Sequence, residues 1–132
     1  MASIFTKIIQ GEIPCYKIAE DDYHFAFLDI NPVSEGHTLV VPKQEVDYLF
    51  NLEDDTLKSL IIFAKKVAKA IDASLDTIRT GVVVEGLEVP HAHIHLVPIH
   101  YEGQHVGLGK KAEVSKERMI ELAERISEAF KK

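Results

Sequence analysis

Residues 91–98 read His91-Ala92-His93-Ile94-His95-Leu96-Val97-Pro98. In a β-strand, successive side chains point to opposite faces, so this stretch puts its histidines on one face and its apolar residues on the other. The apolar side chains can anchor the strand in a core while the imidazoles line a common groove. The sequence therefore predicts a strand from His91 to Ile99 that presents three imidazoles side by side.

Imidazole rings in this arrangement suit chemistry at phosphorus. An ordinary pKa of about 6.5 lets one ring act as a neutral nucleophile while a neighbour acts as a cationic donor at the same pH. The nucleophilic nitrogen must be unprotonated, so the other nitrogen of that ring should donate to a carbonyl. Flanking rings can donate to phosphate oxygens as the leaving group departs. The pattern indicates a phosphate-sized catalytic groove.

Two other interpretations of the histidines stay open at this point. Histidines at positions i and i+2 of a strand can both ligate zinc, and His37 could supply a further ligand. The rings could also be ordinary core or surface residues without a chemical role. Spacing alone does not decide between these alternatives.

The rest of the chain is typical of an α+β fold. Apolar residues recur at i, i+3, i+4 and i+7 from Leu57 to Ile71, which predicts a long helix from about Asp54 to Ala73. A short helix is expected around residues 4–9, and Ser115 is a plausible N-cap for a C-terminal helix. With predicted strands at residues 16–19, 23–30, 37–41, 78–84 and 91–99, we expect about five strands in a mainly antiparallel sheet.

Composition limits the class of protein. A length of 132 residues with 46% hydrophobic content fits a single domain over residues 1–132, with residues 1–113 as its core and 114–132 as the C-terminal helix. A net charge of -6 argues against general nucleic-acid binding. The lone Cys15 excludes an intrachain disulfide, and neither a secretory signal nor a membrane span is visible. We expect a cytoplasmic protein that binds neither nucleic acid nor membrane.

The alternating histidines and the segments before them resemble the histidine triad (HIT) superfamily. The triad pattern is His-φ-His-φ-His-φ-φ, where φ is apolar, and Ala92 is a small occupant of it. Residues 4–14 resemble the amino-terminal segment of the Hint-like branch, and residues 25–32 and 36–43 match its nucleoside-site segment in order and spacing. The similarity runs from about Ser3 to Pro98.

The resemblance implies a function and a role for each matching residue. His93 would attack the α-phosphate of a purine nucleoside monophosphate conjugate, a phosphoramidate or ester, and water would release the monophosphate from the nucleotidyl-histidine. His91 and His95 would orient the nucleophile and contact the phosphate or leaving group, with His37 as a fourth histidine. Asp29 would bind the ribose hydroxyls. The slot for the base would be formed by Phe5, Ile8, Phe27 and Ile30.

Each of these assignments has a plain structural alternative. The apolar slot residues could simply belong to the core, Asp29 could be a turn residue and His37 could merely begin a strand. His24, His100 and His105 match nothing in the family pattern, and we expect them at the surface. The resemblance also implies a homodimer that needs no cofactor.

Two departures from the family pattern affect these expectations. Zinc-binding relatives carry Cys-x-x-Cys where this chain has Ser3 and Thr6, and often a histidine where it has Gln44-Glu45. Hydroxyls do not replace thiolates for zinc, so we expect no metal. The loop before the triad is apolar or acidic where the pattern is polar, and Glu88 could assist the leaving group or recognise a cationic amine. A nucleotide-binding or interaction module with little catalysis is therefore the alternative function.

Overall fold

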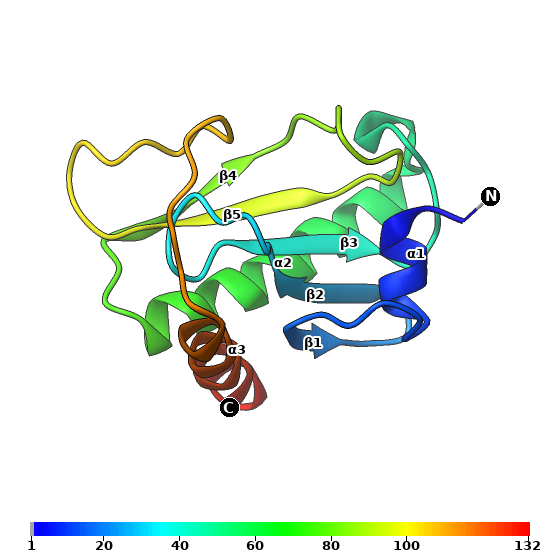
Figure 1. Cartoon of the computed structure of the whole chain (residues 1–132). Coiled ribbons are helices and arrows are strands. Elements are labelled where there is room, and N and C mark those ends of the chain that lie inside the picture. The colour runs from blue at the N-terminus through cyan, green and yellow to red at the C-terminus, as the bar shows by residue number, and fades with distance from the viewer. Residues whose placement is uncertain (1) are drawn as a thin grey trace.

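The computed structural model describes residues 2–132 and contains one five-stranded antiparallel sheet. Its strand order is β1-β2-β3-β5-β4, so β3 and β5 lie inside the sheet and β4 forms one edge (Figure 1). This confirms the predicted α+β class and strand number. The strands are β1 (Lys17–Glu20), β2 (His24–Leu28), β3 (Thr38–Pro42), β4 (Arg79–Val83) and β5 (Ile94–Ile99).

Helices cover both faces of the sheet. On one face α2 (Asp54–Ser74) and α3 (Lys116–Lys131) pack against each other and share the main core with the sheet. On the other face lies the short helix α1 (Ile4–Ile9), whose Phe5 belongs to a second apolar cluster. Because β2 and β3 are buried on both faces, they read as continuous apolar runs. None of the helices within residues 2–132 is both long and apolar enough to cross a membrane.

The start of β5 differs from the prediction, because the strand begins at Ile94 rather than at His91. Just before it, the backbone N–H of Ala92 donates to the carbonyl of Val46 (2.6 Å), which takes that residue out of the strand ladder. The predicted division of faces is nevertheless present, since the apolar residues of this stretch lie in the main core. These core residues are Ala92, Ile94 and Leu96.

The loop between β2 and β3 brings two candidate residues together. Gly36 has a φ of 91°, and a Cβ there would lie 2.6 Å from a methyl carbon of Leu75, so the turn requires glycine. Beyond the turn, the backbone N–H of Asp29 donates to the carbonyl of His37 (2.9 Å). This bond extends the β2–β3 pairing by one step and places Asp29 opposite His37.

Candidate active site

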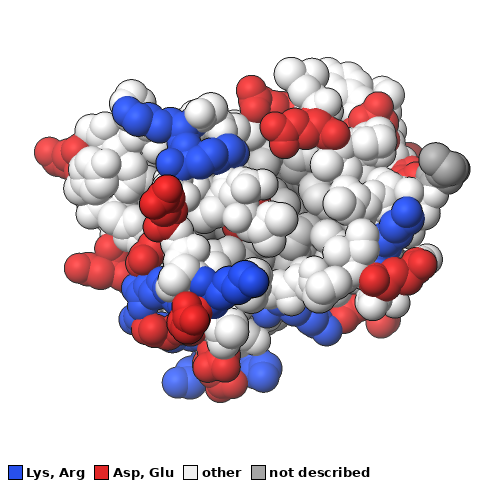
Figure 2. All heavy atoms as spheres, in the orientation of Figure 1, with Lys and Arg blue, Asp and Glu red and all other residues white. Residues whose placement is uncertain are grey.

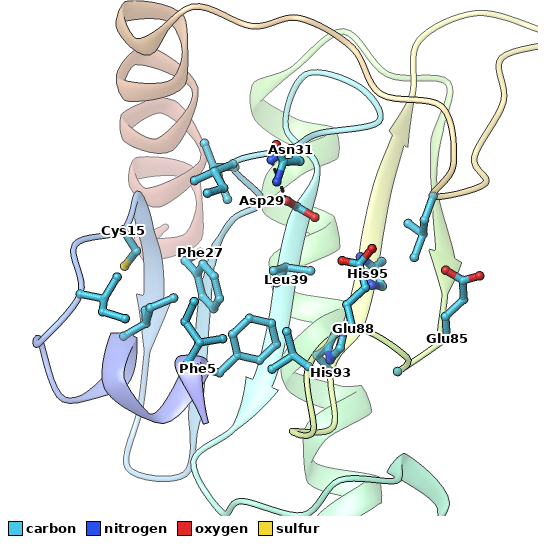
Figure 3. A pocket seen from close by; sticks show the side chains of 18 of the residues that line it. Phe5, Cys15, Phe27, Asp29, Asn31, Leu39, Glu85, Glu88, His93 and His95 are labelled. Atoms are coloured by element: carbon cyan, nitrogen blue, oxygen red, sulfur yellow. Dashed lines mark hydrogen bonds between the residues drawn. The ribbon is translucent and has the colours of Figure 1, made fainter. Parts of the chain in front are cut away.

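A pocket of about 340 Å³ opens on the face of the sheet that carries α1. Its volume lies in the range of small-molecule sites. Figure 3 shows Phe5 and Phe27 at one side of the pocket, Leu39 on its floor, and His93 and His95 at the other side. Eight of the ten predicted site residues line it: Phe5, Ile8, Phe27, Asp29, Ile30, Glu88, His93 and His95.

The apolar side of the pocket is a slot between α1 and β2. The Phe5 and Phe27 rings meet edge to face, with centroids 5.5 Å apart. Ile30 follows β2 at the rim and is 70% exposed, so it is not a core residue. A flat apolar group can enter between these side chains, where aromatic faces and aliphatic groups provide the contacts.

The Asp29 carboxylate stabilises a turn with one oxygen and lines the pocket. Its Oδ1 accepts the backbone N–H of Asn31 (2.8 Å), the bond of an Asx turn. Its Oδ2 lies 3.6 Å from His37 Nε2, which is longer than a good hydrogen bond. This second oxygen is therefore left to accept from a ligand, so the turn role and the binding role are compatible.

His93 presents a bare nitrogen to the pocket. Its Nδ1 lies 2.7 Å from the carbonyl oxygen of His91, and because a carbonyl only accepts, Nδ1 must carry the proton. In the neutral ring, Nε2 then holds a lone pair. Nε2 has no hydrogen-bond partner among the described residues. Every buried polar side-chain atom of those residues does have a partner, so Nε2 is not buried and faces the pocket that His93 lines. Phe5 packs edge-on against this ring (5.0 Å between centroids).

His95 presents the opposite group, an N–H. The backbone N–H of Val33 donates to His37 Nδ1 (2.9 Å), so the proton of His37 is on Nε2. That Nε2–H donates to His95 Nδ1 (3.0 Å), so the proton of His95 is on its Nε2. The His93 and His95 rings lie 4.8 Å apart, centre to centre. The pocket therefore contains a nucleophilic lone pair beside a hydrogen-bond donor.

The donor beside the nucleophile is neutral rather than cationic. Burial, with the nearby His93 adding to it, lowers the pKa of His95 to about 3. Burial and Lys111 lower the pKa of His37 to about 4. Both rings are therefore uncharged at neutral pH, and the expectation of a cationic neighbour in the free protein is wrong.

His91 lies behind the pocket and does not line it. Its ring is fully buried, with Nε2 2.8 Å from the carbonyl of Pro42 and Nδ1 2.8 Å from Ser3 Oγ. Neither nitrogen is free to contact a phosphate, which corrects that part of the prediction. Its carbonyl instead orients His93, so His91 acts through the backbone.

The zinc interpretation can be tested on the same bonds. Asp29, His37 and His95 each place one potential ligand atom within 4.8 Å of the others. His37 Nε2 carries a proton because Nδ1 accepts from Val33, so it cannot ligate a metal while that bond persists. The geometry favours a hydrogen-bonded pair of histidines over a metal centre here.

Charged residues at the pocket rim were not all found from the sequence. Lys111, in the irregular segment after β5, and Glu85, after β4, also line the pocket. Figure 2 shows basic side chains at the upper left of the hollowed face and acidic side chains at its upper right, with both signs of charge along the lower edge. Neither residue lies in a periodic pattern, so only the fold reveals its place.

The remaining histidines divide between interior and surface. His24 is only 6% exposed and stacks on Phe63 (4.9 Å), with its Nδ1 2.9 Å from the Asp21 carboxylate. The prediction of a surface His24 is therefore wrong, and its place in the apolar run of β2 was the available signal. His100 is half-buried and His105 is exposed.

Comparison with known proteins identifies the family. Residues 10–102 match the HIT domain family. The chain belongs to the HIT family. It is 36% identical to the adenosine 5'-monophosphoramidase hnt1 of Schizosaccharomyces pombe, over 99% of this chain and 100% of that protein.

Two further proteins support membership of the HIT family. An uncharacterised HIT-like protein of Borreliella burgdorferi is 37% identical over 94% of this chain and 95% of its own length. The crystal structure of a HIT-like protein from Bartonella henselae, with an unknown ligand, superposes with a TM-score of 0.83 at 32% identity. That comparison covers 96% of this chain and 95% of the other.

The buried neutral histidines of this HIT protein predict a loss of stability in mild acid. Because their folded pKa values lie below the ordinary 6.5, the unfolded chain binds protons first as the pH falls below about 6.5, which favours unfolding. From pH 7 to pH 5, the free energy of unfolding should fall by about 2 kcal/mol for each of His37 and His95.

Urea unfolding at both pH values measures this effect. The His37→Gln variant is the control, because it removes one of the buried rings with a lowered pKa and should reduce the difference by about 2 kcal/mol. A free energy of unfolding that does not change between pH 7 and pH 5 contradicts the assignment of neutral, buried rings.

Proposed function

We propose that this HIT protein hydrolyses conjugates of purine nucleoside monophosphates, phosphoramidates or esters, by attack of His93 on the α-phosphate. The observation that carries the proposal is the open Nε2 lone pair of His93 beside the Nε2–H of His95, at the head of an apolar slot. Its similarity to a monophosphoramidase supports the same chemistry.

In the first step, the His93 Nε2 lone pair forms a bond to phosphorus. The bond from phosphorus to the leaving nitrogen or oxygen breaks, and the leaving group takes a proton from solvent. The His93 ring becomes cationic, so its Nδ1–H bond to the His91 carbonyl strengthens. The His95 N–H donates to a phosphate oxygen as negative charge develops there.

In the second step, water replaces the histidine. Water forms the new bond to phosphorus, the P–Nε2 bond breaks, and its electron pair returns to His93. The protons released from water go to solvent, one of them replacing the proton that the leaving group took. The products are the nucleoside monophosphate and the original neutral ring, and no metal enters either step.

The nucleoside end of the substrate fits the opposite side of the pocket. The base enters the slot formed by Phe5, Ile8, Phe27 and Ile30. The free Oδ2 of Asp29 accepts from the ribose hydroxyls, since a carboxylate oxygen is a strong acceptor for paired O–H donors. These contacts hold the α-phosphate at the two histidines.

The acidic rim fits the leaving group. Glu85 and Glu88 follow β4 and line the pocket on the histidine side (Figure 3). Carboxylates there repel additional phosphates and attract an amine, so phosphoramidates of cationic amines are the better substrates. We therefore assign Glu88 to recognition of the amine that leaves.

The alternative is a nucleotide-binding module with little catalysis. The same acidic loop favours it, because polar groups that contact phosphate in the family pattern are missing from residues 82–90. The two functions share the slot and Asp29, and differ only in whether His93 forms a covalent intermediate.

Release of AMP from adenosine 5'-phosphoramidate tests the proposal. We expect wild-type protein to produce AMP, and His93→Ala to lower kcat by a factor of about a thousand or more, because the nucleophile is lost. Mass analysis of quenched wild-type reactions should detect a nucleotidyl adduct on His93. His105→Ala, at an exposed histidine outside the pocket, is the matched control and should keep full activity. Nucleotide binding without AMP release would support the binding module instead.

We also propose that the protein forms a homodimer through the β4 edge. Among the strands of residues 2–132, β4 pairs only with β5, so its outer edge is open to another strand. Val82 and Val84 beside that edge are 57% and 42% exposed, and Ile61 and Ile62 on α2 are 45% and 54% exposed. A second copy would cover both apolar regions.

We also propose a cytoplasmic location. Cys15 is the single cysteine of the chain, which fits a reducing compartment such as the cytoplasm.

Sedimentation velocity tests the dimer. At micromolar concentration we expect a dimer, and Val82→Glu should weaken it at least about tenfold because a buried carboxylate lacks a partner. Tyr23→Glu is the control, since Tyr23 is 74% exposed and lies in the turn that joins β1 to β2, away from the β4 edge. A wild-type monomer at this concentration would contradict the proposal.

A further inference from the structure

Ser3 and Thr6 lie beside the His91 ring, and Glu45 in turn bonds both of them. Ser3 Oγ lies 2.8 Å from His91 Nδ1, and Glu45 Oε1 accepts both the Ser3 backbone N–H (2.7 Å) and the Thr6 hydroxyl (2.6 Å). Ser3 and His91 are both buried, at 6% and 0% exposure. We call Ser3, Thr6, Glu45 and His91 the His91 network.

Every proton in the His91 network has a defined place. The Pro42 carbonyl can only accept, so His91 Nε2 carries the proton and Nδ1 is an acceptor. Glu45 can only accept while it is ionised, and the hydrogen bonds from Ser3 and Thr6 lower its pKa to about 2. The Thr6 proton therefore goes to Glu45, and the Ser3 hydroxyl donates to His91 Nδ1 (2.8 Å), which is closer than its other acceptor, Thr6 Oγ1 (3.3 Å).

The His91 network leads directly to the nucleophile. The ring of His91 is held at both nitrogens, and its own carbonyl oxygen accepts the Nδ1–H of His93 (2.7 Å). The peptide group that carries this carbonyl is held on its other side by the bond from the Ala92 N–H to Val46 (2.6 Å), so this bond and the ring together hold His91 in place. A bond made 88 residues earlier in the chain, at Ser3, thus helps to hold the residue whose carbonyl accepts the His93 proton.

We propose that Ser3 and Glu45 are positioning residues, which hold His91 so that its carbonyl keeps the Nε2 of His93 unprotonated and aimed into the pocket. The proposal deepens the function proposed above and rests on it. Neither residue lines the pocket, so neither should contribute to substrate binding. Their loss should lower kcat and leave KM almost unchanged.

A merely structural role for Ser3 has a distinct signature. Ser3 is also the N-cap of α1, since its Oγ accepts the backbone N–H of Thr6 (3.0 Å). Ser115 caps α3 in the same way, with its Oγ 3.1 Å from the backbone nitrogen of Arg118, and is not part of the His91 network. Ser115→Ala therefore removes a comparable cap without touching His91.

Steady-state kinetics with adenosine 5'-phosphoramidate separates the two roles. We expect Ser3→Ala to lower kcat about tenfold or more, with KM within about twofold of wild type. Ser3→Thr keeps the hydroxyl and should recover most of kcat. Ser115→Ala should match wild type in both constants. Wild-type kcat in Ser3→Ala, or an effect confined to KM, overturns the proposal.

Glu45 gives an independent pair of variants at an exposed position. Glu45→Gln keeps an acceptor oxygen for Ser3 and Thr6 and should stay near wild type, whereas Glu45→Ala should lose kcat as Ser3→Ala does. If Ser3→Ala does not fold, this pair of Glu45 variants still tests whether the His91 network positions His93. Equal activity of the two Glu45 variants overturns the role of Glu45.

A measurement without substrate keeps this proposal separate from the proposed function. The His91 Nε2–H, bonded to Pro42, should exchange slowly with water in NMR spectra of the wild type and at least about tenfold faster in Ser3→Ala. If the wild type releases no AMP, the proposed function fails. The exchange rate of the His91 Nε2–H then still tests whether Ser3 holds the His91 ring in place. Unchanged exchange in Ser3→Ala overturns that role of Ser3.

Discussion

One hydrogen bond, from His93 Nδ1 to the carbonyl of His91, decides which nitrogen of the His93 ring presents a lone pair to the pocket. The proposed reaction in the pocket requires the lone pair of His93 to be on Nε2, the nitrogen that faces the slot and the His95 N–H. The carbonyl keeps its direction because the Ala92 N–H of the same peptide group donates to Val46 (2.6 Å) and because the His91 ring is held between Pro42 and Ser3. The histidine that looks catalytic in the sequence pattern thus serves as a support, and its backbone provides the contact that matters.

Burial sets the charge of the site as firmly as the hydrogen bonds set its tautomers. His37 and His95 are held neutral, so a pair of uncharged rings presents a single N–H to the pocket. A preorganised neutral donor needs no rearrangement when negative charge develops on phosphorus, which is how such groups stabilise a transition state. Stability at low pH is reduced as a result, because protonation of either ring favours the unfolded chain.

The sequence was most informative where a local pattern determines the structure. Alternation placed Ala92, Ile94 and Leu96 in the core, and the α2 periodicity located that helix to within one residue at its end. Prediction failed where distant backbone groups intervene: Val46 takes the start of the triad out of β5. Ser3 and Glu45 stood out as departures from a zinc-binding pattern, but their contact across 42 residues depends on the packing of α1. The charge of His95 likewise depends on burial, which no short motif records.

The proton position on His93 is the most direct test of this account. Long-range proton–nitrogen NMR correlations on the substrate-free protein at pH 7 can assign the tautomer of each labelled histidine. We expect His93 to carry its proton on Nδ1, with Nε2 bare, and His95 to be protonated on Nε2, with Nδ1 bare. A His93 ring protonated on Nε2 would contradict this expectation, because the nitrogen facing the pocket would then have no lone pair for attack on phosphorus.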